Sequence, residues 1–214
     1  MRTRTTSSVG SPTGSERRLP LRGTLRPRAA LLAVLASFAA CISVPGGTPA
    51  EKRAHVDAYA EESIALLLKQ SPEVKAEFDA AKGYAVVHES GLKVPVFGGE
   101  TGWGVVVDRE SGKRTYVKQR GFEIGAGWGA RVQRVISILH TTEQVQAARD
   151  GGFEFSAGAE AGAKVGDVGG GMQGAASSKS GASIYVLLET GAAATATAGV
   201  IRLSQYDALN TTDG

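Results

Sequence analysis

The pattern of hydrophobic and polar positions changes once along the chain, from a helical period to a period of two. Between Glu51 and about Gln70, apolar residues recur at helical spacing and acidic residues lie opposite them. A second helix is predicted to begin with Ser71 as N-cap and Pro72 in its first turn, and to end at Gly83. The segments after Gly83 alternate in polarity, which predicts strands.

The clearest alternation runs from Gly121 to Gln133. One side of this segment is apolar or small, at Phe122, Ile124, Ala126, Trp128, Ala130 and Val132. The other side holds only glycine and polar residues, at Gly121, Glu123, Gly125, Gly127, Gly129, Arg131 and Gln133. This pattern predicts a strand whose apolar side, including Trp128, lies in the core. Residues 153–165 repeat it.

Turn and cap residues divide the remaining chain into further elements. We expect a connection near Ser90–Gly91, a hairpin turn at Glu110–Gly112, a helix with Thr142 as N-cap and Gly151 as its end, a glycine-serine loop over 165–181, and a final hairpin over 182–206. The predicted class is α+β, with N-terminal helices followed by a curved, glycine-rich antiparallel sheet of barrel-like form. Glycine suits such a sheet because it permits bends and close backbone approach.

The six residues 125–130, Gly-Ala-Gly-Trp-Gly-Ala, also fit a loose dinucleotide-binding fingerprint. That loop needs a buried strand before it and a helix after it. Residues 115–123 are not a continuous apolar run, and 131–140 read most simply as a continuing strand. We therefore interpret these glycines as allowing the strands to bend and pack closely, and we predict no cofactor.

The first 41 residues differ from the rest, with seven Arg, one Glu and an apolar run over 29–40. The run is shorter than the ~20 residues of a membrane-spanning helix. Together these features predict a secretory signal peptide. Its end, Phe38-Ala39-Ala40-Cys41, resembles a bacterial lipobox, which predicts acylation at Cys41; ordinary cleavage beside an incidental cysteine is the alternative. Residues 42–50 would form a flexible tether, and 51–214 the domain.

Charge points to a lipid surface rather than to nucleic acid. Without the seven Arg and one Glu of the signal, the 24 basic and 21 acidic residues become 17 and 20, so no nucleic-acid partner is expected. Basic residues instead gather in one stretch, and the candidate lipid-binding set is Lys113, Arg114, Lys118, Arg120, Arg131 and Arg134. Anionic headgroups attract such residues. An ordinary solvated hairpin is the alternative.

Catalytic and metal-binding patterns are weak. The three histidines are scattered, no nucleophile motif is present, and the single cysteine falls in the signal. We therefore predict neither an enzyme nor a metal site. A hydrolase would have to use Glu123, Arg131, Glu154 and Glu160, the polar candidates on the sheet.

Five segments in order resemble the lipid-binding SYLF domain, most closely its bacterial secreted branch. They are "AKGYAVVHES", "VFGGETGWGVVV", "GFEIGAGWGARVQRVISIL", "GGFEFSAGAEAGAKVGD" and "IYVLLETGAAATATAGVIRL" with the closing "YDALN". The resemblance covers residues 54–210 and implies an α+β domain that binds phospholipid without catalysis. The chain departs from eukaryotic members in its acidic N-terminal helices. Their actin binding is not expected, because an exported bacterial lipoprotein would not meet actin.

These observations together predict a membrane-tethered envelope lipoprotein. It would face the periplasm, anchored to the outer membrane, or be soluble there if the signal is cleaved elsewhere. Its expected partner is a phospholipid membrane. The alternative is a structural envelope protein that binds another protein through the surface of its sheet.

Overall fold

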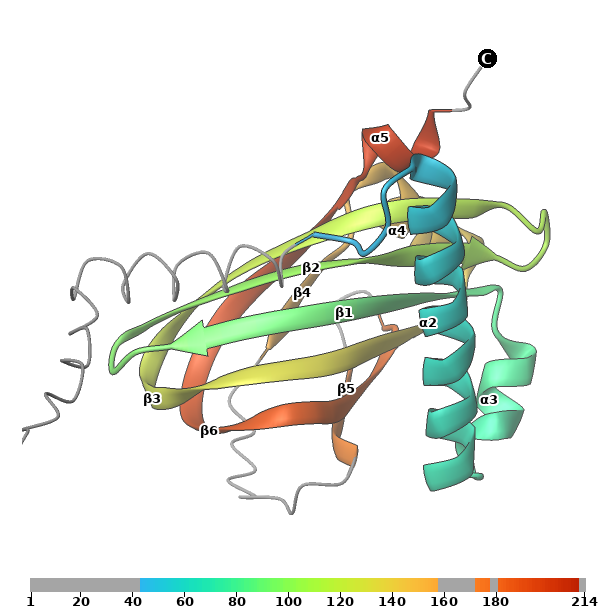
Figure 1. The fold of residues 1–214 in the computed structure, drawn as a ribbon. Coiled ribbons are helices and arrows are strands. Elements are labelled where there is room, and N and C mark those ends of the chain that lie inside the picture. The colour runs from blue at the N-terminus through green and yellow to red at the C-terminus, as the bar shows by residue number, and fades with distance from the viewer. Residues whose placement is uncertain (1–42, 158–171, 178–180, 212–214) are drawn as a thin grey trace, which may run out of the picture. The chain divides into compact units, whose positions relative to one another are not determined.

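The computed structural model describes residues 43–157, 172–177 and 181–211 (Figure 1). The elements in order are α2 (Pro49–Gln70), α3 (Val74–Ala80), β1 (Gly83–Lys93), β2 (Phe97–Asp108), β3 (Arg114–Leu139), α4 (Thr142–Asp150), β4 (Glu154–Ala157), β5 (Met172–Ser177), β6 (Ser183–Gln205) and α5 (Asp207–Asn210). Helices come first and a curved antiparallel sheet follows. The predicted α+β class is therefore confirmed, and the sheet forms a half-barrel.

The sheet is built by wrapping long strands around one hairpin. β1 and β2 pair from Gly83↔Asp108 to Lys93↔Gly98. The first half of β3 pairs with β2, and its second half returns along β1. β6 follows β3 over most of its length, with one register shift at Val132/Gln133. β4 and β5 pair with two different parts of β6.

β3 bends where it passes the β1–β2 turn. Gly125 and Gly129 have φ angles of 145° and 152°, which residues with side chains rarely adopt. The N–H of Gly125 donates to the carbonyl of Val96, 3.0 Å away, and fastens the bend to the turn. The segment thus lies inside a strand that continues to Leu139, as expected. It does not precede a helix, so it is not a dinucleotide-binding loop.

The two faces of the wrapped sheet differ in what covers them. We call the side under α2, where Trp103 lies, the outer face, and the side under α4 the inner face. On the outer face, the Trp103 ring lies 5.1 Å from Tyr59 and 4.8 Å from His88, measured between centroids. On the inner face, Val145 and Ala148 of α4 pack in a cluster with Ala85 and other core residues. In Figure 1, α2 crosses one end of the sheet, and the β1–β2 turn lies at the other.

Inner-face glycines lie where strands approach closely. A Cβ built on Gly104 would collide with the carbonyl oxygen of Val86 and come within 2.8 Å of the Cα of Val87. A Cβ on Gly102 would lie 2.5 Å from the carbonyl oxygen of His88. These obstacles are backbone atoms, which cannot rotate away. The glycines therefore set how tightly the hairpin coils.

The predicted burial of the alternating strand was wrong in direction. Phe122 and Ile124 are each 53% exposed, and Trp128 is 70% exposed, whereas Glu123 is buried. The apolar side of β3 is its outer side near the bend, beyond the reach of α2. The inner side, with the glycines and polar residues, is the enclosed one.

Several predicted boundaries were also wrong. Ser71 caps the end of α2 rather than the start of α3, and Gly83 begins β1 instead of ending a helix. β1 continues through Ser90–Gly91, and its turn lies at residues 94–96. Thr141, not Thr142, is the N-cap of α4.

Two further predictions differ from the structure, and two others agree with it. The predicted final hairpin is one continuous strand, β6, because it follows the bend of β3 instead of turning back. The predicted loop over 165–181 contains β5. The turn at Glu110–Gly112 and the helix end at Gly151 were correct, both with left-handed glycines. Residues 158–165 of the predicted second alternating strand lie outside the described residues.

The close approach at Gly104 predicts a difference between two glycines of β2. We expect Gly104→Ala to destabilise the fold by about 1–3 kcal/mol, because the new methyl group overpacks against backbone. Gly99→Ala is the matched control, since a Cβ there meets nothing within 4 Å. It should change stability by less than about 0.5 kcal/mol. Urea unfolding measures both; equal effects would refute the close-approach role.

Candidate functional site

The six basic residues predicted to form one surface are divided among three environments. Lys113 and Arg114 lie at the β2–β3 turn, while Lys118 and Arg120 are farther along β3. Seven residues of strand separate Lys113 from Arg120, or roughly 23 Å at ~3.3 Å per residue. Arg131 and Arg134 lie beyond the bend. The set therefore does not form a single patch.

Arg114 and Arg134 bind the acidic side of α2. Arg114 lies 2.9 Å from Asp57 and 3.4 Å from Glu61. Arg134 is buried and lies 3.4 Å from Glu62. These acids belong to the helix that the sequence marked as unusually acidic. Both arginines therefore hold α2 against the sheet.

Further contacts immobilise Arg134. Its Nε lies 2.6 Å from Glu189 of β6, and its guanidinium carbon lies 4.4 Å from the centre of the Tyr59 ring. The pKa of Glu189 is lowered by its hydrogen bond to His88 and the charge of Arg134, which outweigh its partial burial. Arg134 is thus unavailable to a lipid headgroup.

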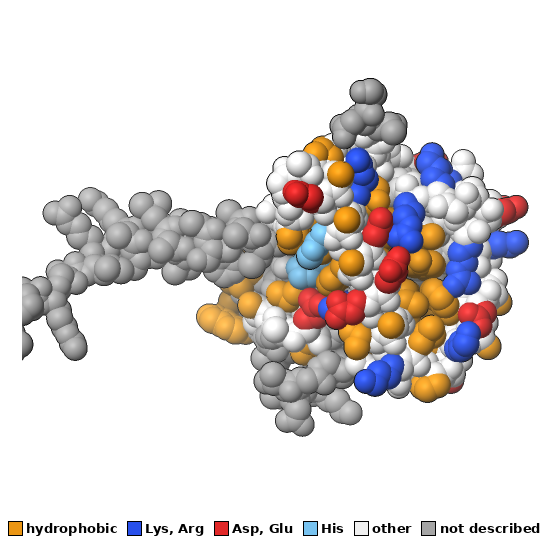
Figure 2. Space-filling model, turned by 45° about the vertical axis from the view of Figure 1, so that its right-hand side comes forward, with side chains coloured by type: hydrophobic (Ala, Val, Ile, Leu, Met, Phe, Trp, Pro, Cys, Tyr) orange, Lys and Arg blue, Asp and Glu red, His pale blue; other side chains and the backbone are white. Residues whose placement is uncertain are grey.

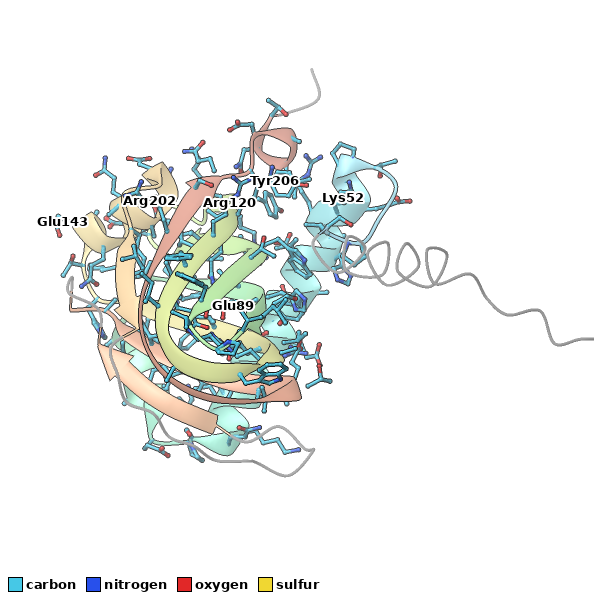
Figure 3. The ribbon with its side chains drawn as sticks, turned by 90° about the vertical axis from the view of Figure 1, so that its left-hand side faces the viewer. Lys52, Glu89, Arg120, Glu143, Arg202 and Tyr206 are labelled. Carbon is cyan, nitrogen blue, oxygen red and sulfur yellow. The ribbon has the colours of Figure 1, made fainter. Side chains whose placement is uncertain are left out.

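Lys113, Lys118 and Arg120 remain exposed. The Nζ atom of Lys118 lies 4.1 Å from the centre of the Tyr206 ring. Arg120 lies opposite Arg202 of β6 in the antiparallel register, and Arg202 is also exposed. Figure 3 shows Arg120, Arg202 and Tyr206 along the outer side of these strands, whereas Glu89 lies between the arms of the curved sheet. We call Lys118, Arg120 and Arg202 the basic rim.

Arg131 belongs to a buried polar cluster inside the bend. The cluster consists of Glu89, Lys93, Glu100, Gln119, Glu123, Arg131 and Gln133. The side-chain amides of Gln119 and Gln133 donate to the two carboxylate oxygens of Glu89. Arg131 pairs with Glu100 and lies 3.6 Å from Glu123. Lys93 is 4.0 Å from Glu123, and its Nζ atom has no hydrogen-bond partner among the described residues.

The glycines of the inner face make room for this cluster. Gly98 faces Glu123 in the register, and a Cβ on Gly98 would collide with that side chain. Gly121 faces Glu100, and a Cβ there would come within 2.9 Å of its carboxylate. Larger residues at these positions would displace the charged groups. The glycines of the inner face therefore occur at the positions where space is needed for the buried charged side chains.

Three carboxyl groups and two cations share this enclosed space, so one carboxyl group holds its proton easily. Burial raises the pKa of Glu89. Burial, with repulsion from Glu89, raises the pKa of Glu100 to about 8 against the attraction of Arg131. A protonated carboxyl group at neutral pH lowers the cost of enclosing this excess of negative charge.

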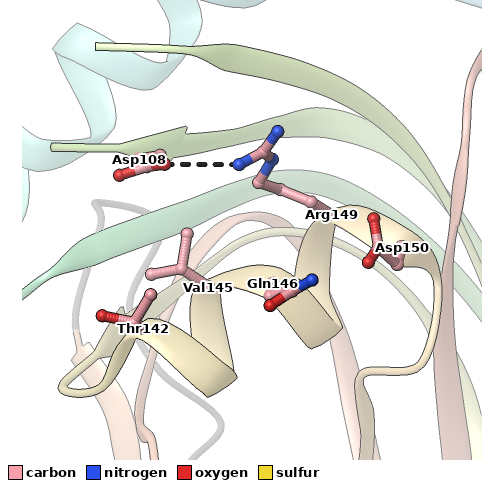
Figure 4. Close-up of a pocket in the computed structure, with 6 residues that line it drawn as sticks. All are labelled: Asp108, Thr142, Val145, Gln146, Arg149 and Asp150. Atoms are coloured by element: carbon pink, nitrogen blue, oxygen red, sulfur yellow. Dashed lines mark hydrogen bonds and ion pairs between the residues drawn. The ribbon is translucent and has the colours of Figure 1, made fainter. Parts of the chain in front are cut away.

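Of the four residues predicted for a hydrolase, the structure shows only two to be neighbours. Glu123 and Arg131 are neighbours, but Glu123 is buried and Arg131 is nearly so. Glu160 lies outside the described residues, and of Glu154 only the strand position is described. A separate hollow of about 260 Å³ lies beside α4 (Figure 4), lined by Asp108, Thr142, Val145, Gln146, Arg149 and Asp150. Its Asp108 already accepts from Ser111 and pairs with Arg149 at 3.3 Å.

The residues that sequence reasoning missed are apolar and exposed. They are Leu92, Val94, Val96, Phe97, Phe122, Ile124, Trp128 and Val200, which we call the apolar tip. They lie at the β1–β2 turn and on the outer side of β3 and β6 beside it. Figure 2 shows charges of both signs intermingled on the face it presents, and a hydrophobic group at its left margin. The alternation in β3 was the available signal, but it was assigned to the core.

The described residues contain neither a membrane-spanning helix nor a metal-binding cluster. Within these ranges no helix has the length and apolar character needed to cross a bilayer. Nor do the described side chains gather three histidine, cysteine or acidic residues in a way that would hold a metal ion. Cys41, the predicted acylation site, lies outside the described residues.

Comparison with known proteins found a partial similarity. Over 107 residues, half of this chain, the sequence is 30% identical to Beta cell expansion factor A of Aeromonas veronii. The match spans 41% of that protein, so it concerns less than half of the relative. No protein-family model matches the chain.

The raised pKa of Glu100 predicts how stability depends on pH. Between its ordinary value of 4.5 and about 8, the folded state holds a proton that the unfolded chain releases. The contribution of Glu100 to stability is therefore full below pH 4.5 and is lost as pH rises through 8. At about 1.4 kcal/mol per unit, we expect a loss of roughly 2–4 kcal/mol between pH 5 and 8.

Urea unfolding across that pH range tests this expectation. Glu100→Gln keeps the shape of the protonated group and should flatten the decline. Glu110→Gln, in the exposed β2–β3 turn, is the control and should leave the decline unchanged. A steep decline that persists in Glu100→Gln would show that another group binds the proton.

Proposed function

We propose that this chain is an exported, lipid-anchored envelope protein whose SYLF-like domain binds anionic phospholipid without catalysis. The proposal begins from the five SYLF-like segments in order and from the lipobox-like end of the predicted signal.

The observation that carries the lipid-binding proposal is the exposed basic rim. Arg120 and Arg202 lie opposite one another on antiparallel strands, with Lys118 two residues farther along the same side of β3. Glu154 of β4 lies opposite Arg202 on the other side of β6, so Lys118 and Arg120 are the cations of the rim on which the proposal depends. Each basic residue close to an anionic bilayer contributes about 1 kcal/mol of attraction. Arg114, Arg131 and Arg134 have no part in this proposal, because their charges are used internally.

A charge-reversal experiment tests the basic rim. We expect Lys118→Glu combined with Arg120→Glu, in residues 43–214, to weaken binding to anionic vesicles at least about tenfold, because two attractions become repulsions. The control is Lys52→Glu combined with Lys69→Glu on α2, which changes net charge equally. Co-sedimentation with anionic and neutral vesicles is the measurement.

The two double variants separate the competing explanations. Equal weakening in both would mean that overall charge, and not the basic rim, governs binding. If the unaltered domain shows no preference for anionic vesicles, lipid binding is refuted. A reproducible protein partner captured on the apolar outer side of the sheet would then favour the structural alternative, since exposed apolar surface also suits protein partners.

Acylation at Cys41 makes a separate prediction. The chain should be released from the envelope by detergent but not by high salt, because acyl chains anchor through hydrophobic contact. Cys41→Ser should instead enter the salt-soluble fraction. Mass analysis of the N-terminal peptide gives the acyl groups directly. An unmodified N-terminus beginning elsewhere would show ordinary cleavage.

A further inference from the structure

We infer that the apolar tip inserts into the interface of an anionic lipid bilayer, while the basic rim contacts the headgroups. This inference rests on the proposed lipid binding and assigns the part of the molecule that enters the lipid. No residue of the apolar tip was in the predicted lipid-binding set.

The apolar tip is a continuous surface, not a scatter of residues. Phe97 lies opposite Ile124, and Phe122 lies opposite Val200. The Phe97 and Phe122 rings have centroids 6.2 Å apart. All the large hydrophobic residues identified as exposed in the described part of the chain belong to this tip. Contiguous exposed apolar surface of this kind marks an interaction site.

Charge distinguishes a lipid surface from other occupants. Between Leu92 and Arg131 of the hairpin and bend, the acidic residues that lie near the tip are Glu100 and Glu123, and both point inward. On the outer side of this segment, Lys118 and Arg120 therefore border the apolar residues, and Glu154 lies beyond them opposite Arg202. That is the arrangement an anionic bilayer needs, with the acyl boundary below the phosphates.

The spacing along β3 also fits the depth of an interface. Phe122 and Ile124 lie two and four residues from Arg120 on the same side of the strand. At ~3.3 Å per residue these positions are roughly 7 and 13 Å from the arginine. Interfacial elements bury their apolar side about 5–10 Å. With Arg120 at phosphate level, Phe122 at roughly 7 Å falls within that depth, and Ile124 at roughly 13 Å would lie slightly deeper.

The two tryptophans of the chain provide a built-in probe. Trp103 is buried under α2, and Trp128 is 70% exposed in the tip. Trp128 alone should respond to lipid. We expect the full chain carrying Trp103→Phe to show a blue-shifted emission with anionic vesicles, and at least about half of it to be quenched by lipids brominated near the headgroup end of their chains. The matched Trp128→Phe chain, which reports Trp103, should show neither change.

A second pair of variants tests the inference without requiring that the Trp103→Phe chain folds. Phe97→Ser and Ile124→Ser replace exposed residues, so folding should be retained, and together they should weaken vesicle binding roughly tenfold or more. Subtracting the emission of the Trp128→Phe chain from that of the unaltered chain gives the signal of Trp128. An unquenched Trp128 signal with unchanged binding of the serine variants overturns the inference.

The outcomes separate this inference from the function it rests on. A chain that prefers anionic vesicles while Trp128 stays unquenched binds lipid by another surface, so only the tip assignment fails. A chain without that preference refutes the proposed function and the inference together. If acrylamide cannot reach Trp128 in the free protein, another segment or a second copy covers the tip and the inference is wrong; sedimentation then distinguishes the two.

Discussion

The fold depends on a cross-strand match between glycines and charged residues on its inner face. Gly98 stands opposite Glu123, and Gly121 opposite Glu100, and each glycine leaves the space its partner fills. Without that space, β3 would have to move away from the hairpin or turn its charges outward. The hydrogen bonds of Gln119 and Gln133 to Glu89, and of Arg131 to Glu100, then satisfy these two carboxylates, whereas the Nζ of Lys93 has no hydrogen-bond partner among the described residues. A tightly coiled sheet with a polar interior is the result.

The direction of the outer side follows from this arrangement. Since successive residues of a strand point to opposite faces, enclosing Glu123 places Phe122 and Ile124 outside. Helix α2 covers the outer face only around Trp103. The apolar residues beyond it stay exposed. The same side-chain alternation along β3 therefore buries charge inside the bend and exposes apolar surface at the tip.

The candidate site shows how far charge along a sequence can mislead. Lys118 and Arg120 were predicted from the sequence and are exposed, and Arg202 joins them only through strand pairing. Arg134 was predicted with them, yet it lies beneath α2 beside Glu62, which is 72 positions earlier in the sequence. A local count of basic residues cannot reveal that a distant acidic helix neutralises some of them. The apolar tip was visible as an alternating pattern, but alternation does not say which side meets solvent.

The sequence by itself determined that helices precede a strand-rich region, that residues 121–139 form a strand, and that the glycines of residues 121–133 lie on one side of it. These follow from local periods and from the conformations that each residue type permits. Only the tertiary structure decided which side is enclosed, because enclosure depends on β1 and β2 meeting β3 on both sides of its bend. The same wrapping joined the predicted final hairpin into one strand and separated the six predicted cations. Such outcomes depend on contacts between distant segments, which no local pattern encodes.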